Sequence, residues 1–216
     1  AGYNKKNKTR TFDYNQYAYN LKSIQLYYED GVNALNPDQY INEEAFDAGA
    51  FSVLEISNAA SKYDVNQDVN AVYGILDIFY AEKIKITTGA RLENGFQKII
   101  YKDQQQPTLT KQNIINSTDI LPSLILKYNI SDKSAATISG SKTISRPGFK
   151  EIAPFEYWEF FAGIKSKGNP ELLNGSNYNA DVRYEIYPSN AELIAITAFG
   201  KILQNPIERT MLATAS

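Results

Sequence analysis

The segment Ile84-Lys85-Ile86-Thr87-Thr88-Gly89-Ala90-Arg91-Leu92-Glu93 alternates between two kinds of side chain. Its even-numbered positions are aliphatic or threonine, whereas its odd-numbered positions include lysine, arginine and glutamate. Successive side chains of a β-strand point to opposite faces. The segment therefore predicts a strand with one face suited to lipid or to a core and the other suited to water.

The same alternation recurs at 121–130 and 177–187, where the charged residues again keep to one face. This pattern is typical of strands that are apolar on one side only. Weaker alternation marks four further candidates, at about 3–16, 65–80, 134–146 and 192–203. We therefore expect about seven strands in this chain.

The connections between these segments alternate in length. Short ones, rich in turn-forming residues, lie at 81–83, 131–133 and 188–191, and long ones at about 17–62, 103–118 and 147–175. Outer-membrane barrels have this asymmetry, with short periplasmic turns and long extracellular loops. The sequence thus predicts an all-β fold in which residues 1–216 form part of a single antiparallel, up-and-down transmembrane β-barrel domain.

The first long loop contains one helix signal. Asn36-Pro37-Asp38 is typical of a helix start, with asparagine as the N-cap and proline at the first helical position. We expect a short helix from Asp38 to Asp47 that ends near Gly49, since glycine favours the left-handed conformation after a helix.

Composition excludes several functional classes. The 216 residues include no cysteine and no histidine, so zinc sites of Cys/His type and Ser-His-Asp catalysis are excluded. The 22 basic and 24 acidic residues form no evident basic stripe, and we expect no nucleic-acid partner. A membrane strand needs only about 9–11 residues, so the lack of a long apolar run does not exclude a membrane protein. We expect no cofactor and no bound metal.

Several motifs, in order along the chain, resemble those of the TonB-dependent receptors, a family of outer-membrane transporters. They are Gly89-Ala90-Arg91-Leu92-Glu93 (G-x-R-x-E), Leu121-Pro122-Ser123-Leu124 (LPS-x-L), Ser145-Arg146-Pro147, Gly168-Asn169-Pro170-Glu171-Leu172 (GNP-x-L) and Phe199-Gly200-Lys201 followed by Asn205-Pro206-Ile207-Glu208. The resemblance covers about residues 65–210, whereas residues 1–64 fit only by position.

The resemblance implies an intact barrel of about 22 strands around a plug domain, in the outer membrane of a Gram-negative cell. Such a receptor imports a large nutrient, such as an iron chelate, cobalamin or a glycan, with energy relayed by the TonB system. The chain has no plug domain and no TonB box, and its expected strand number is odd, so we interpret it as a C-terminal-side fragment of the barrel. Outer-membrane lipid and a surface lipoprotein are further candidate partners. The sequence does not indicate which nutrient is bound.

Two sets of residues are candidates for the functional site. An aromatic stretch of the loop at 147–175 could stack on a ligand or pack against a neighbouring loop or protein; it comprises Phe155, Tyr157, Trp158, Phe160 and Phe161. The charged strand residues should face the lumen, as contacts to the plug or as cross-strand ion pairs; these are Lys85, Arg91, Glu93, Asp181, Arg183 and Glu185.

Three weaker hypotheses concern other residues. Arg146-Pro147 either closes a strand, because proline lacks a ladder N–H, or contacts a ligand or the plug at the rim. Asp64, Asp68 and Asp119 could together bind calcium. A carboxylate pair for glycoside hydrolysis would have to come from Glu151, Glu156 and Glu159, but no supporting motif accompanies them, and we expect no enzymatic activity.

Two alternatives to a transporter remain open from the sequence. One is a soluble, secreted β-rich module that binds a glycan, and the other is a plugless outer-membrane barrel with a structural or adhesive role. Lipid-facing residues separate the first alternative from a membrane protein. Such residues should form one exposed apolar band, as we expect for Ile84, Ile86, Leu124, Leu126, Val182 and Ile186.

Overall fold

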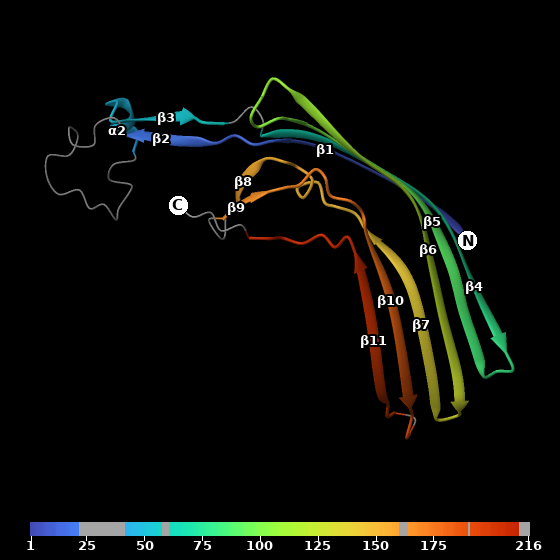
Figure 1. Ribbon diagram of the computed structural model, residues 1–216. Coiled ribbons are helices and arrows are strands. Elements are labelled where there is room, and N and C mark those ends of the chain that lie inside the picture. Colours follow the sequence, from blue (N-terminus) through green and yellow to red (C-terminus); the bar gives the residue numbers. More distant parts are fainter. Residues whose placement is uncertain (22–41, 58–60, 160–163, 190, 212–216) are drawn as a thin grey trace.

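The computed structural model describes the whole chain except residues 22–41, 58–60, 160–163, 190 and 212–216 (Figure 1). Its main element is one curved antiparallel sheet. In spatial order its strands are β1 (Gly2–Asp13), β4 (Lys62–Tyr80), β5 (Ile84–Lys102), β6 (Thr110–Ser131), β7 (Ser134–Ser145), β10 (Gly175–Ile186) and β11 (Ile194–Gln204). The expectation of about seven antiparallel strands is confirmed. The sheet is open, because β1 and β11 each pair with one neighbour only.

Two predicted boundaries are wrong. The loop expected at 103–118 spans only 103–109, because β5 continues to Lys102 and β6 begins already at Thr110. With 19 and 22 residues, these two strands are about twice as long as a membrane crossing requires. The part of each long strand that lies far from the short turns is here called the distal half, and the part next to the turns is the band half.

The outer face of the band half is an apolar surface. The pairing register aligns Ile86 with Leu126, Leu126 with Ile138, and Ile138 with Val182. In the next row towards the turns, Ile84, Tyr128 and Tyr184 lie on the same face. Leu124 and Val182 are 49% and 52% exposed, so the band is not covered by a second sheet. The six residues predicted to face lipid share this surface.

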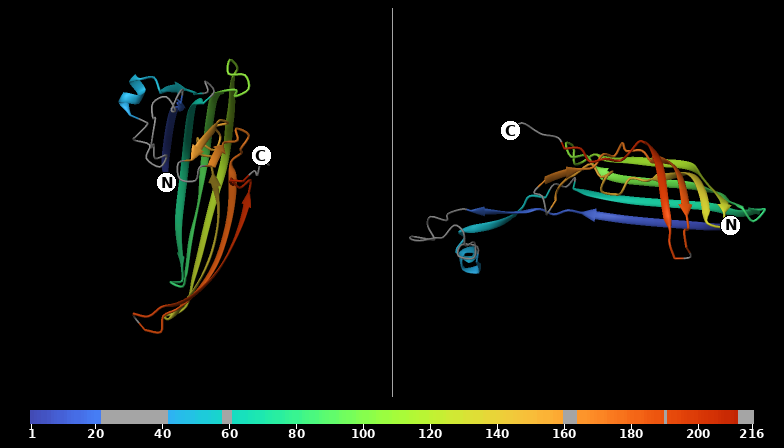
Figure 2. Two further views of the ribbon diagram at one scale, coloured as in Figure 1. Left: turned by 90° about the vertical axis from the view of Figure 1, so that its left-hand side faces the viewer. Right: turned by 90° about the horizontal axis from the view of Figure 1, so that it is seen from below.

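The distal half has the opposite pattern. On β4 the outer face carries Asp64, Asn66 and Asp68, whereas the inner side chains of Tyr63 and Val65 are buried. The buried cluster on this inner face includes Ile152, Ala153 and Phe155 from the β7–β10 connection. Figures 1 and 2 show this connection lying over the concave side of the sheet at the end opposite the short turns. The core of the described chain therefore lies between the sheet and its own loop.

Short elements occur inside the long connections. They are the hairpin β2 (Tyr17–Leu21) with β3 (Phe51–Glu55), the hairpin β8 (Glu156–Glu159) with β9 (Ile164–Lys167), and helix α2 (Glu43–Asp47). The helix is shorter than predicted: Asn42 is its N-cap and accepts a hydrogen bond from the Ala45 amide at 2.8 Å. The predicted cap Asn36 lies outside the described residues. Gly49 has a φ of 75°, as expected after the helix end. Within the described ranges, no helix is long and apolar enough to cross a membrane.

Candidate functional site on the inner face of the sheet

The candidate site lies where the β7–β10 connection begins. Directly after β7 ends at Ser145, the side chain of Arg146 turns inward and its guanidinium lies against Gly95 of β5. A Cβ atom at position 95 would lie 2.9 Å from both Nε and Nη2 of Arg146. Any larger residue at this position would therefore displace the guanidinium, so Gly95 provides the space in which Arg146 lies flat on the strand.

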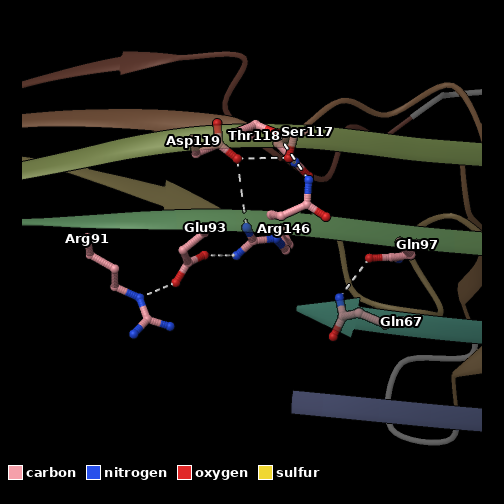
Figure 3. A network of polar contacts seen from close by, with 10 residues as sticks. Gln67, Arg91, Glu93, Gln97, Ser117, Thr118, Asp119 and Arg146 are labelled. Atoms are coloured by element: carbon pink, nitrogen blue, oxygen red, sulfur yellow. Dashed lines mark hydrogen bonds and ion pairs between the residues drawn. The ribbon is translucent and has the colours of Figure 1, made fainter. Parts of the chain in front are cut away.

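Arg146 is the centre of an ion-pair network (Figure 3). Its Nη1 lies 2.7 Å from Oε2 of Glu93, and its Nη2 lies 3.8 Å from Oδ2 of Asp119. The other carboxylate oxygen of Glu93 accepts a hydrogen bond from Nε of Arg91. The Glu93 side chain is only 9% exposed and that of Arg146 17%. Two cations and two carboxylates are thus gathered in a half-enclosed site, where each charge needs an opposite neighbour.

The network continues into the connection between β9 and β10. Oδ2 of Asp119 accepts a hydrogen bond from the Ser117 hydroxyl, and Ser117 accepts one from Nδ2 of Asn174, both at 2.8 Å. Nδ2 of Asn113 also donates to the backbone carbonyl of Pro170. These bonds attach the second end of the long loop to β6, just as Arg146 attaches its first end to β5.

A buried amide pair supports the same region from β4. Nε2 of Gln67 donates to Oε1 of Gln97 at 2.8 Å, and Nε2 of Gln97 donates to the backbone carbonyl of Pro147 at 3.2 Å. Pro147 is buried and follows Arg146 directly. The Ser-Arg-Pro segment therefore does close a strand, and it also joins three neighbouring strands to the loop.

Position 168, in the connection between β9 and β10, has room only for glycine. Its amide donates to the Ala153 carbonyl at 3.1 Å, and a Cβ atom would lie 2.5 Å from the Lys150 carbonyl and 2.7 Å from the Glu151 carbonyl. The next amide, of Asn169, donates to the Glu151 carbonyl at 2.6 Å. The two ends of the connection thus pack against each other through their backbones, which leaves no room for a side chain at 168.

The six charged residues expected to face the lumen lie on the inner face of the sheet. Arg91 and Glu93 belong to the network, and Arg183 similarly pairs with Glu185 at 2.8 Å. Lys85 lies 3.6 Å from Asp77, and Asp181 accepts a hydrogen bond from Ser139 at 3.2 Å. The two arginine pairs join residues two apart on one strand, whereas the sequence suggested cross-strand pairs. Contact of these residues with a plug or a transported solute stays a prediction.

The loop aromatics are placed differently from one another. Phe155 is 2% exposed and stacks on Phe12, at 5.3 Å between ring centroids, and beside Tyr63 at 5.6 Å. It therefore anchors the loop rather than presenting its ring on the surface. Tyr157 is half-buried, and Nζ of Lys150 lies 5.0 Å from its ring centroid. Trp158 lies in β8, but its side chain is outside the described part, as are Phe160 and Phe161. Ligand contact by this set stays a prediction.

The calcium hypothesis is wrong. Asp64 and Asp68 point to the outer face of β4, whereas Asp119 points to the inner face of β6, so the sheet separates them. The glutamates considered for hydrolysis have other neighbours: Glu151 accepts a hydrogen bond from the Gly148 amide at 2.7 Å, and Glu156 lies 3.8 Å from Lys165. The Glu159 side chain is outside the described part.

A curved antiparallel sheet that is apolar outside, polar inside and linked by short turns at one end is the wall of an outer-membrane β-barrel. The sequence matches the outer membrane protein beta-barrel family over residues 2–215. The chain therefore belongs to this family, and the protein is located in the cell outer membrane. This localisation excludes the soluble, secreted module considered above. No curated protein matches the sequence.

Proposed function

We propose that this barrel wall belongs to a TonB-dependent receptor that imports a large nutrient, of the class of iron chelates, cobalamin or glycans. One observation carries the proposal: three separate segments that resemble the receptor motifs meet in a single network. Arg91 and Glu93 come from the first, Arg146 from the second, and Asn174 follows the third. These segments are 28 and 53 positions apart, measured from Arg146 to Asn174 and to Glu93, and they have a common role if the network positions the loop inside the barrel.

In this proposal the distal half of the sheet faces the exterior and the inner face surrounds a plug domain. Nε and Nη2 of Arg146 are buried and donate no hydrogen bond within the described residues. A buried donor without an acceptor costs about 1–3 kcal/mol, so acceptors supplied by a plug would stabilise the intact receptor. The TonB system would then act on the plug, and a surface lipoprotein would be a partner at the distal end.

The proposed activity is binding and energised passage, without catalysis. The carboxylates of the inner network are engaged by arginines, which leaves Glu93 and Asp119 as structural anions and not as proton-transfer groups. Selectivity for the nutrient would depend on the distal loops, because loops carry the binding residues of proteins built on rigid scaffolds.

Uptake measurements test the proposal. The gene for the full-length protein is deleted in its host, and uptake of radiolabelled iron chelates, cobalamin and oligosaccharides is compared with that of the parent, with and without collapse of the proton-motive force. We expect the uptake of one nutrient to be lost when the gene is deleted. In the parent, uptake of the same nutrient should be lost when the proton-motive force is collapsed. The plugless-barrel alternative predicts no energy dependence and an open pore when the full-length protein is inserted into a planar lipid bilayer. Either result would refute the receptor proposal.

A further inference from the structure

The first strand carries a row of positive charges along the inner face of the distal half. Lys6 pairs in register with Val69, Lys8 with Gln67 and Arg10 with Val65, whose side chains all lie on the buried inner face of β4. Residues two apart on a strand lie about 7 Å apart on the same face. Lys6, Lys8 and Arg10, here called the cationic ladder, thus form a linear array of three charges.

No carboxylate of the described chain neutralises the cationic ladder. The other inner cations of the distal half are paired: Arg91 and Arg146 with Glu93 and Asp119, and Lys111 with Asp103. Lys6, Lys8 and Arg10 are exposed and have no acidic partner among the residues that the structure describes. The ladder therefore gives the mouth of the barrel wall a local excess of positive charge, which attracts anions over about 8–10 Å at moderate salt.

An aromatic stack extends the cationic ladder at its distal end. Cζ of Arg10 lies 5.3 Å from the centroid of the Phe12 ring, which orients the guanidinium by a cation–π contact. Phe12 stacks on Phe155, and Phe155 lies 5.6 Å from Tyr157, over which Lys150 is placed. A cation therefore lies at each end of the aromatic stack, so charges and ring surfaces lie side by side on this face.

We propose that the cationic ladder binds a chain-like solute with several carboxylate or phosphate groups, such as an acidic oligosaccharide. The inference rests on the proposed function, because such a solute would be the imported nutrient. Repeated cations at a fixed spacing match repeated anions, and the half-buried rings of Phe12 and Tyr157 leave an edge that can contact the carbon atoms of a sugar. The ladder lies on the face opposite the apolar band, so a lipid headgroup of the surrounding membrane does not reach it.

The sequence analysis missed this feature. In Lys5-Lys6-Asn7-Lys8-Thr9-Arg10 the cations are mixed with polar residues, and no basic stripe was evident. Only the register of β1 separates Lys5 on the outer face from Lys6, Lys8 and Arg10 on the inner face. The conclusion that the chain has no basic stripe is therefore wrong for this strand.

Equilibrium binding to the full-length protein in detergent micelles tests the proposal. The probes are tetragalacturonate, its methyl ester, which has the same body without charge, and inorganic tripolyphosphate. The ladder variant combines Lys6→Gln, Lys8→Gln and Arg10→Gln. The control variant combines Lys5→Gln and Lys98→Gln, which remove charge from the outer face of the same half. Circular dichroism verifies that all proteins are folded.

We expect one of the two anionic probes to bind to the wild type more weakly as salt rises. The ladder variant should bind it at least about tenfold more weakly, since it lacks the three cations that would donate charge-assisted hydrogen bonds to the anion. The control variant and the affinity for the ester should not change. The proposal is overturned if neither anion binds the wild type, if the ester binds equally well, or if the ladder variant keeps wild-type affinity, as it would if acidic groups of another domain neutralise the ladder. Binding in micelles needs no energy source, so lost import with intact binding would count against the receptor and not against the ladder.

Discussion

The band half and the distal half of β4 carry opposite patterns on the same strand. In the band half the outward, even-numbered positions are apolar throughout, with Val72, Leu76 and Ile78 exposed, whereas the inward positions mix Asp77 with the apolar Ile75 and Phe79. In the distal half the buried residues Tyr63, Val65 and Val69 are odd-numbered and point inward. Hydrophobic alternation therefore follows the environment of each face and not the strand as such. The pattern changes sides where the lipid ends and the docked loop begins.

The largest expected effect tests the distal core. Phe155→Ala should destabilise docking of the β7–β10 connection by about 3–5 kcal/mol, as expected when a buried phenylalanine is truncated. Hydrogen exchange of the amides from 146 to 174 measures the docking. Leu173→Ala, at a 62% exposed position of the same connection, is the control and should change exchange little. Equal protection in both variants would mean that the inner cluster does not hold the loop.

The next effect tests the band. Leu76→Arg places a charge in the middle of the apolar surface and should reduce the free energy of unfolding by about 2–4 kcal/mol in lipid vesicles. Asn66→Arg is the matched control, because it lies on the same face of the same strand but in the distal half. It should change stability by less than about 0.5 kcal/mol. Similar losses for both variants would remove the distinction between the two halves.

A smaller effect tests the contact between the Arg146 guanidinium and Gly95 of β5. Gly95→Ala should cost about 1–3 kcal/mol, because the added methyl group overlaps the guanidinium and must displace it. Gly140→Ala is a suitable control, since the nearest atom to its Cβ position is 3.8 Å away. Urea titrations of the refolded proteins measure both. A neutral Gly95→Ala variant would show that Arg146 does not depend on contact with β5.

The smallest effect concerns an exposed loop at the distal end. The ammonium of Lys111, followed by the amides of Gln105 and Gln106, holds the pKa of Asp103 below its ordinary value of 3.8. A lowered pKa means that this contact stabilises the loop at neutral pH and is lost as the pH falls through the pKa of the folded state. In an NMR titration of labelled aspartate, Lys111→Gln should raise the Asp103 pKa towards the ordinary value. An unchanged pKa would show that the ion pair is not formed in solution.

The band half could be predicted from the sequence because lipid outside and water inside impose one simple alternation on each strand. Ile84, Leu124 and Val182 all lie where this alternation places them. The distal half could not be predicted in the same way. There Ile114 and Ile115 point to opposite faces of β6, so no period-two pattern marks residues 110–118, and this stretch was expected to be a loop.

The candidate site was partly predictable for a related reason. Alternation placed Arg91 and Glu93 on the polar face correctly, because both belong to one strand. The link from Glu93 to Arg146 joins residues 53 positions apart and depends on β7 ending at Ser145, which no local pattern reports. The need for glycine at position 95 likewise could not be predicted, because it depends on the Arg146 guanidinium that lies against this position in the fold.

Spin labelling along β4 tests the central claim, the change of environment within one strand, most directly. The chain has no cysteine, so single substitutions such as Asn66→Cys, Asp68→Cys, Leu76→Cys and Ile78→Cys each carry one nitroxide in vesicles. Collision with oxygen reports lipid, and collision with a nickel chelate reports water. The account predicts an oxygen-dominated signal at 76 and 78 and a nickel-dominated signal at 66 and 68. A lipid signal at all four positions, or a water signal at all four, would contradict it.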